Sequence, residues 1–274
     1  MNRRRARLLR HRLGLAGAAL VAVMLLAAAG APVWGTQDPL GIRMSQALEP
    51  PTRQHWFGTD QFGRDVWSRV VYGARLSLTV GLASMLLATA AGVPLGAAAG
   101  YTGGAADALV MRCMDAILAF PALLLAIGLV AAWGPGTESG IIAIGVVYVP
   151  VFARVTRGAV LARRHEEYVE AARALGQSDF AILRRHILPN CFAPVLVQAT
   201  LGFASAIVID AGLSFLGAGT PPPAPDWGTM LNEARAFMVS APYVAIFPGL
   251  AISLAVLGFN MLGDGLRDVL DPRL

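Results

Sequence analysis

Few side chains in this sequence could do chemistry, and none has the spacing of a catalytic or metal centre. The four histidines, at positions 11, 55, 165 and 186, are scattered, and no HxxxH or CxxC spacing occurs. Every basic side chain is arginine, so the chain lacks the lysine with which a P-loop reaches the terminal phosphates of ATP. We therefore expect no catalytic residue, no metal and no cofactor in this chain, with any such ATP hydrolysis on another subunit.

Isolated ionisable residues are the remaining candidates. Asp210 lies deep within an apolar run, where charged groups are costly and often functional. It could line or gate a pathway, or it could be a structural group satisfied by a partner, and the sequence leaves both readings open. Asp60, Arg64 and Asp65 could form a cation site, but calcium-loop spacing is absent, so we expect a turn with local ion pairs.

The elements that position these residues are long apolar runs. The chain is 56% hydrophobic and 14% charged, against about 25% charged in soluble domains. Runs of about 20 residues or more can each cross roughly 30 Å of hydrocarbon, and in lipid they must be helical. We predict an all-α, polytopic membrane protein with six transmembrane helices, at residues 13–37, 76–100, 109–133, 139–160, 192–217 and 243–262.

The arginines predict the orientation of the chain. Six of them precede residue 13, which favours a cytoplasmic N-terminus and, after six spans, a cytoplasmic C-terminus. The basic start also fits a signal peptide, but the apolar run is longer than the usual 7–15 residues, so we interpret it as an uncleaved span. Segments 34–70 and 220–241 are then external, and segment 166–190 is cytoplasmic. Because the arginines flank spans, we read them as topology signals and expect no nucleic-acid partner.

Small residues predict close packing between spans. Gly92, Gly96 and Gly100 form two overlapping GxxxG repeats on one helical face, where another helix could approach closely. Chance occurrence in a sequence rich in Ala and Gly is the alternative. Prolines within spans can kink them, and they stand at positions 94, 121, 150 and 248.

Segment 166–190, between the fourth and fifth spans, predicts a short helix–turn–helix. Gly176 can end a first helix with positive φ, and Ser178 can cap a second helix that Pro189 stops. Two sets of apolar side chains are each predicted to share one face: Tyr168, Ala172 and Leu175 in the first helix, and Phe180, Leu183 and Ile187 in the second. Periodicity alone would equally allow a plain surface connector.

The same segment resembles the EAA loop of permease subunits in ATP-binding-cassette importers. In that family the loop is a coupling helix that seats in a cleft of the ATPase subunit. Small alanines would let the backbone approach the cleft, Glu170 could pair with a basic group there, and Gly176 would permit the turn. The matching positions, which the resemblance assigns to coupling with the ATPase, are Glu170, Ala171, Ala172, Leu175, Gly176, Ile187, Leu188 and Pro189.

Three further segments narrow the resemblance to the C-type inner-membrane permease of dipeptide and oligopeptide importers. They are residues 55–81, 213–231 and 248–274, so the likeness extends from about residue 55 to the end. Asp210 departs from the Glu found in many relatives, and the proline run at 221–223 is slightly longer than the usual pair.

The resemblance implies the fold, the partners and the location. The fold would be that of type I importer permeases, with residues 1–75 as tail, first helix and external loop, and residues 76–274 as a five-helix core containing a coupling loop at 162–191. The partners would be a second permease, two ATPase subunits that use ATP and Mg, and an extracytoplasmic binding protein that delivers peptides or a related small solute. The location would be the bacterial plasma (inner) membrane.

Two other classes of protein are weighed against this interpretation. An ion-coupled secondary transporter usually shows internal repeats and ionisable groups near the membrane midplane, and neither is clear here. A membrane enzyme would need paired carboxylates, histidine clusters or an activated nucleophile, and the spans offer almost none.

Overall fold

The protein is an assembly of helices in the computed structural model, which describes residues 12–270. Within these residues there is no β-strand, only one antiparallel bridge between Thr59 and Asp65. The α-helices are α2 (Arg12–Ala29), α3 (Ala31–Trp34), α4 (Val66–Thr102), α5 (Gly104–Leu118), α6 (Ala122–Trp133), α7 (Thr137–Leu161), α8 (Glu167–Ala174), α9 (Asp179–Ile182), α10 (Phe192–Phe215), α11 (Trp227–Ala234) and α12 (Tyr243–Leu270). Shorter turns are a 3₁₀ turn at Met44–Gln46, a π turn at Leu183–Ile187 and 3₁₀ turns at Leu188–Cys191 and Arg235–Phe237.

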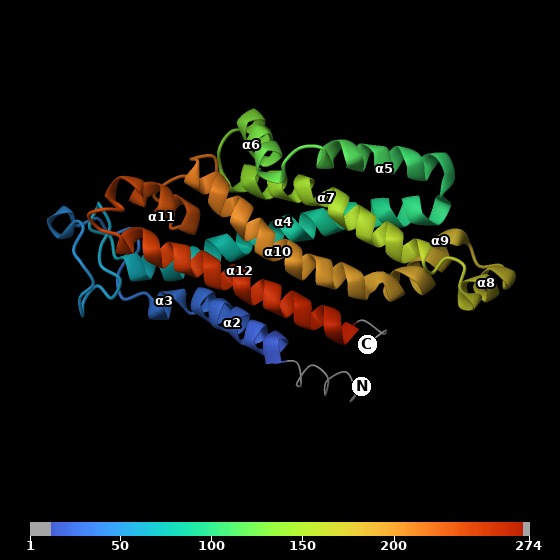
Figure 1. Cartoon of the computed structure of the whole chain (residues 1–274), viewed down its shortest axis with the longest axis horizontal. Helices are drawn as coiled ribbons and strands as arrows, with labels where there is room; N and C mark the ends of the chain where they lie inside the picture. The colour runs from blue at the N-terminus through green and yellow to red at the C-terminus, as the bar shows by residue number, and fades with distance from the viewer. Residues whose placement is uncertain (1–11, 271–274) are drawn as a thin grey trace.

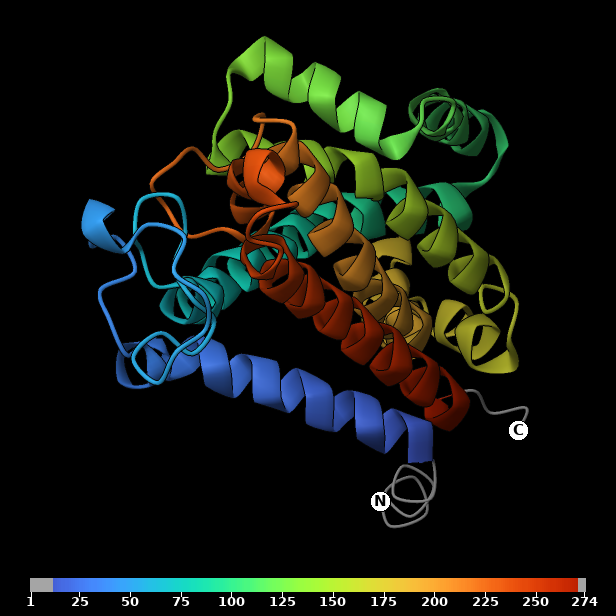
Figure 2. The same cartoon turned by 60° about the vertical axis from the view of Figure 1, so that its left-hand side comes forward.

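The long helices run side by side as one bundle, with α2 along its edge (Figure 1). Figure 2 shows α2 lying against α12, and the two helices are antiparallel, since Gly14 meets Gly265 while Gly17 meets Leu262. A Cβ at Gly17 would lie 2.5 Å from the backbone nitrogen of Leu262, so only a residue without a side chain permits this approach. The buried core lies mainly among α4, α7 and α10.

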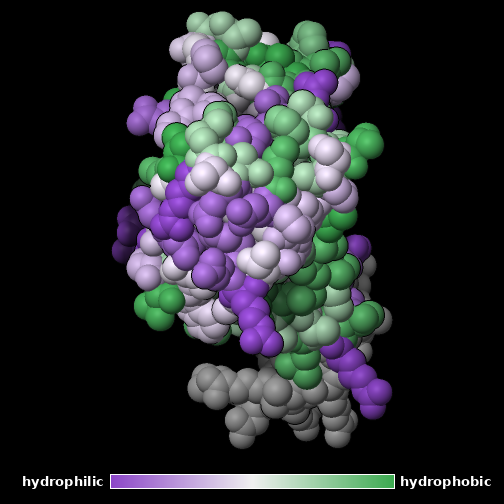
Figure 3. All heavy atoms as spheres, turned by 90° about the vertical axis from the view of Figure 1, so that its left-hand side faces the viewer, coloured by the Kyte–Doolittle hydropathy of each residue, from purple (hydrophilic) through white to green (hydrophobic). Residues whose placement is uncertain are grey.

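The two ends of the bundle differ in what they carry. Residues 36–65 and α11 form one end, here called the α11 end, and the loop with α8 and α9 forms the opposite α8 end (Figure 1). Viewed end on, the surface of the α11 end is hydrophilic over much of its middle (Figure 3). The first residues of α2 and the last of α12 point toward the α8 end (Figure 1).

The predicted membrane-spanning architecture is confirmed, with one correction in the third span. Between residues 12 and 270, five helices are long and apolar enough to cross a membrane, and α5 and α6 together make a sixth only as a pair bent by 90°. Run 109–133 is therefore not one straight helix. Pro121 has an extended ψ of 131° and no N–H to continue the helix, so α5 ends before it and α6 begins after it.

The second span begins at Val66, ten residues before the predicted run 76–100. The Asp65 side chain caps α4 by accepting from the Ser68 backbone N–H at 2.8 Å. The first three turns of α4 carry buried polar side chains, among them Arg69, so a search for apolar runs misses them. The boundary predicted between residues 75 and 76 falls within α4.

Buried ion pairs hold the α11 end together. Arg64 donates to Asp60 at 2.6 Å and to Glu233 of α11 at 2.8 Å, and Arg69 donates to Glu233 at 3.1 Å. The expectation of a turn with local ion pairs is confirmed, and the network also extends to α11, 164 residues further along the chain from Arg69. Charged groups this deeply buried are stabilising only when paired, so these contacts fix residues 60–69 against α11.

Candidate functional site: the loop between α7 and α10

The turn between α8 and α9 is built on Gly176. Its φ is +77°, in the left-handed region where a Cβ is strained. The Gly176 N–H donates to the Arg173 carbonyl at 3.0 Å and the Gln177 N–H donates to the Ala172 carbonyl at 3.2 Å. This pair of bonds is a Schellman closure, which satisfies carbonyls at the end of α8 and reverses the chain.

The second helix of the loop starts as predicted but continues beyond Pro189. The Ser178 hydroxyl accepts from the Ala181 N–H at 3.4 Å and so caps α9. After Ile182 the helix widens into the π turn, closed by the Leu188 N–H donating to the Leu183 carbonyl. Pro189 then sits in the first turn of the 3₁₀ segment, where its missing N–H costs little, and the helix passes directly into α10. The expectation that Pro189 stops this helix is wrong.

The π turn also changes which apolar side chains are buried. Ile182 and Ile187 are both fully buried, and their spacing of five residues fits a turn closed by an i to i+5 bond. Phe180 is 72% exposed, so the predicted shared face of Phe180, Leu183 and Ile187 does not form. That face assumed a regular period of 3.6 residues, which the π turn interrupts.

The loop has a small hydrophobic core of its own. It is formed with the ends of α4 and α7, and it is separate from the main core. Burial raises the pKa of the Tyr168 hydroxyl at its edge. Its buried members are Ala97, Ala159, Val160, Val169, Ala172, Ile182, Ile187 and Cys191.

The tip of the loop presents apolar side chains to solvent. Leu175 is 82% exposed and Phe180 is 72% exposed, on either side of the Gly176 turn. Leu175 therefore points away from buried Ala172, against the predicted shared face. Glu170 is exposed on α8, as is Ala171. Two large hydrophobic side chains held out by a folded turn at the α8 end are the features of an interaction surface.

Polar contacts tie the loop to α4. The Tyr101 hydroxyl donates to Asp179 Oδ1 at 2.5 Å, and Arg173 Nη2 donates to the Tyr101 oxygen at 3.5 Å. The bond with Tyr101 raises the pKa of the Arg173 guanidinium. The sequence did not predict that Tyr101 contacts the loop, because Tyr101 lies outside it. It also did not predict that Phe180 is exposed, because its spacing placed it on a shared apolar face.

The three glycines of the GxxxG repeats in α4 lie against α7. A Cβ at Gly92 would lie 2.6 Å from the Val149 carbonyl, one at Gly96 would lie 2.1 Å from the Ala153 carbonyl, and one at Gly100 would lie 2.9 Å from that of Arg157. Each of these three atoms is a backbone atom of α7. Glycine at these positions therefore allows the backbones of the two helices to touch.

Asp210 is buried in α10 near the α11 end, with 3% of its surface exposed. None of residues 12–270 forms a hydrogen bond or ion pair with its carboxylate. Asp226, which caps α11 by accepting from the Thr229 N–H at 3.0 Å, acts on this carboxylate as a like charge. Within this chain the Asp210 carboxylate is therefore shielded from solvent.

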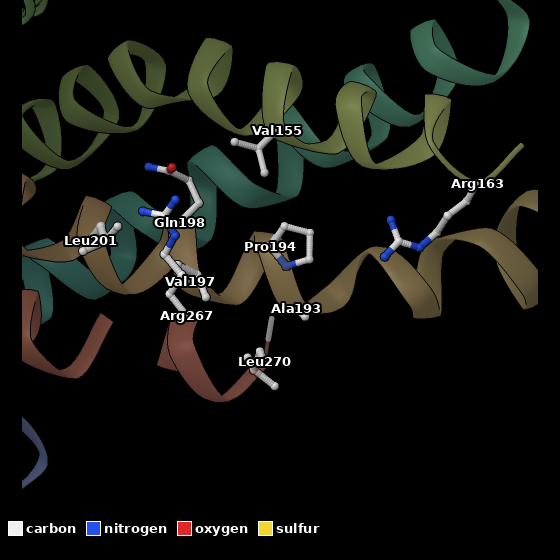
Figure 4. A pocket seen from close by; sticks show the side chains of 9 residues that line it. All are labelled: Val155, Arg163, Ala193, Pro194, Val197, Gln198, Leu201, Arg267 and Leu270. Atoms are coloured by element: carbon white, nitrogen blue, oxygen red, sulfur yellow. The ribbon is translucent and has the colours of Figure 1, made fainter. Parts of the chain in front are cut away.

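A groove of about 490 Å³ opens instead between α7, α10 and α12 near the α8 end. Figure 4 shows the polar heads of Gln198 and Arg267 lying together at one end and Arg163 at the other, with an apolar floor between them. The floor and sides consist of Val155, Ala193, Pro194, Val197, Leu201 and Leu270. Because this groove has both polar and apolar surface, it suits a solute that has both polar and apolar groups.

Comparison with known proteins decides the family. Residues 92–274, which include α7, the loop and α10, match the family described as the binding-protein-dependent transport system inner membrane component. The chain belongs to this family. It is a permease component of a binding-protein-dependent transport system, and the resemblance seen in the sequence is confirmed.

Named relatives cover most of this permease. The dipeptide transport system permease protein of Alkalihalophilus pseudofirmus is 47% identical over 265 residues, which is 97% of this chain and 87% of the relative. The glutathione transport system permease protein of Pectobacterium atrosepticum is 49% identical over 226 residues, 82% of this chain and 75% of the relative. Among solved structures, a chain of the MetNI methionine ABC transporter in an inward-facing conformation matches with a TM-score of 0.61 and 19% identity, covering 74% of this chain and 96% of that chain. This last match supports the fold.

Proposed function

We propose that this permease forms, with a second permease, a membrane pathway for small peptides or a closely related solute. The observation that carries the proposal is the likeness to relatives named for dipeptide and glutathione transport, at 47% and 49% identity. Both named cargoes are small peptides that carry carboxylate groups. The groove of Gln198 and Arg267 supports the proposal, because it combines an apolar floor with groups that bind carboxylates.

The loop between α7 and α10 would receive the ATPase. Leu175 and Phe180 would enter an apolar cleft of that subunit, and Glu170 would pair with a basic group beside it. Gly176 holds the two anchors on one rigid turn, and the loop's own core keeps them exposed. Ala171, Ala172, Ile187, Leu188 and Pro189 would act indirectly, because they shape or support this turn.

The proposed complex contains this chain, a second permease, two ATPase subunits and an extracytoplasmic binding protein. ATP and Mg would act on the ATPase subunits, since this chain has no lysine for a P-loop. The α8 end, toward which the first described residues of α2 and the last of α12 point, would lie in the cytoplasm of a bacterial cell, and the hydrophilic α11 end would meet the binding protein. The two termini lie outside the described residues, and the arginines before residue 13 support placing them in the cytoplasm as well. Family membership speaks against the alternative of an ion-coupled secondary transporter.

The test is peptide uptake by the complete complex in proteoliposomes, with two variants that each change an exposed apolar residue to serine. Phe180→Ser alters the α8 end, and Val239→Ser is the matched control for ATPase attachment, since Val239 is 99% exposed at the α11 end, away from the loop. We expect wild type to take up a labelled dipeptide only when ATP and binding protein are present. Phe180→Ser should lose uptake and retain less ATPase, whereas Val239→Ser should retain as much ATPase as wild type. Uptake by wild type without ATP, or equal ATPase retention by the two variants, would contradict the proposal.

A further inference from the structure

Helix α4 is longer than a membrane requires. Its 37 residues, Val66–Thr102, extend about 55 Å at 1.5 Å per residue, against roughly 30 Å of hydrocarbon. It is therefore long enough to project at both ends, and it makes specific contacts at each.

At the α8 end, α4 is bonded to both helices of the loop. Tyr101 donates to Asp179, the first residue of α9, and accepts from Arg173 of α8. Beside them, Arg164 Nη1 donates to the Gly100 carbonyl at 3.1 Å. A displacement of the loop would therefore pull or push on the last turn of α4.

At the α11 end, α4 is bonded to α11. The Ser77 hydroxyl donates to Asp226 Oδ1 at 3.1 Å, and the Trp227 indole N–H donates to the Val70 carbonyl at 2.9 Å. The ion pairs to Glu233 add a third attachment, near the other end of α11. Trp227 is 1% exposed, so these contacts are deeply buried and hold α11 to one face of α4.

The other covalent route from the loop is less regular. The path into α10 passes through the π turn at Leu183–Ile187 and the 3₁₀ turn at Leu188–Cys191. Changes of helix type of this kind can absorb a displacement by local unwinding or rewinding. By contrast, α4 remains α-helical throughout its length, although Pro94 removes one backbone hydrogen bond. Contact with the backbone of α7 at Gly92 and Gly96, on either side of Pro94, supports the helix at that point.

We propose that α4 is a mechanical link between the ATPase-facing loop and the α11 end, and that Tyr101 is the positioning residue that attaches the loop to it. This inference rests on the proposed docking of the ATPase at the loop. Tyr101 touches neither cargo nor nucleotide in this role. Its hydroxyl transmits movement, while its ring packs against the loop's core.

The experiment follows a change at the α11 end when nucleotide binds at the other end. A fluorophore is attached to a cysteine at position 239 in the complete complex, after Cys113 and Cys191 have been replaced with alanine. A non-hydrolysable ATP analogue is titrated, and the concentration that gives half the fluorescence change is measured. Tyr101→Phe removes only the hydroxyl, and Tyr72→Phe is the control, since none of residues 12–270 hydrogen-bonds to that hydroxyl.

We expect Tyr101→Phe to raise the half-change concentration about tenfold, the effect of losing a coupling free energy equal to one hydrogen bond to a carboxylate. Ser77→Ala should have a similar effect from the other end of α4. Tyr72→Phe should match the wild type, and all variants should retain the ATPase subunits.

Several results would overturn the link. An unchanged half-change concentration in Tyr101→Phe and Ser77→Ala would show that α4 does not transmit the movement. No fluorescence change in the wild type would show that nucleotide binding causes no movement at position 239. Loss of ATPase subunits from Tyr101→Phe alone would show that Tyr101 builds the docking surface instead. If the wild-type chain itself retains no ATPase, the proposed function fails.

Discussion

Replacing Gly96 with alanine should destabilise the packing of α4 against α7. The new Cβ would lie 2.1 Å from the Ala153 carbonyl oxygen and 2.8 Å from its carbonyl carbon, well inside normal contact. The obstacle is backbone and cannot rotate aside, so the two helices must separate.

The size of the effect follows from two opposing contributions. Overpacking of a core costs about 1–3 kcal/mol, whereas alanine in place of a helical glycine gains about 0.5–1 kcal/mol. Because the clash involves backbone, we expect the upper part of the first range and a net loss of about 1–2 kcal/mol. Gly158→Ala in α7 is the matched control, since a Cβ there would meet nothing within 4 Å. This variant therefore keeps only the stabilisation that comes from replacing a helical glycine with alanine.

The assay is the thermal unfolding midpoint of the purified variants in one detergent, together with their abundance in the membrane. Gly96→Ala should unfold at a lower temperature than wild type and be less abundant, and Gly158→Ala should be equal to wild type or better. Equal midpoints for the two variants would refute the argument that backbone contact between α4 and α7 requires glycine.

Three other predictions concern topology, the buried carboxyl and ATP. In a chain without Cys113 and Cys191, an external thiol reagent should modify Ser45→Cys and miss Ala174→Cys, both at exposed positions; the reverse pattern would invert the proposed orientation. Asp210→Asn should keep membrane abundance and most of the uptake, because the structure shows no basic partner for this carboxylate within residues 12–270; normal abundance without uptake would indicate a gating role. The purified chain alone should hydrolyse no ATP, because it has no P-loop lysine, and measurable activity free of partners would contradict this.

Local backbone rules made much of the loop predictable from sequence. Gly176 allows the positive φ that ends α8, and Ser178 caps the start of α9. Both roles follow from the residue type itself, so they do not depend on distant contacts. The apolar runs likewise indicated the spans, because in lipid a long apolar segment has few alternatives to a helix.

Features that depend on tertiary context were not predictable in the same way. The π turn after Ile182 is favoured by the burial of Ile182 and Ile187 against α4 and α7, and nothing local distinguishes it from an α-helix. Pro121 signalled a kink, but the 90° bend depends on how α6 packs against its neighbours. Tyr101 stands 78 residues from Asp179, so their bond can be seen only in the folded chain.

Two loop variants test whether the loop between α7 and α10 couples this permease to an ATPase. At Gly176 a Cβ would meet no neighbour, so Gly176→Val acts only through the positive φ, with a strain of roughly 1–2 kcal/mol. Glu170→Lys reverses an exposed charge without touching the loop's core.

The measurement is dipeptide uptake together with the amount of ATPase that copurifies with each variant, at matched abundance in the membrane. If the loop couples the permease to the ATPase, both variants should insert normally, lose uptake and retain less ATPase than the wild type. Uptake and ATPase retention at wild-type levels in both variants would contradict it, because the loop would then be a solvated connector.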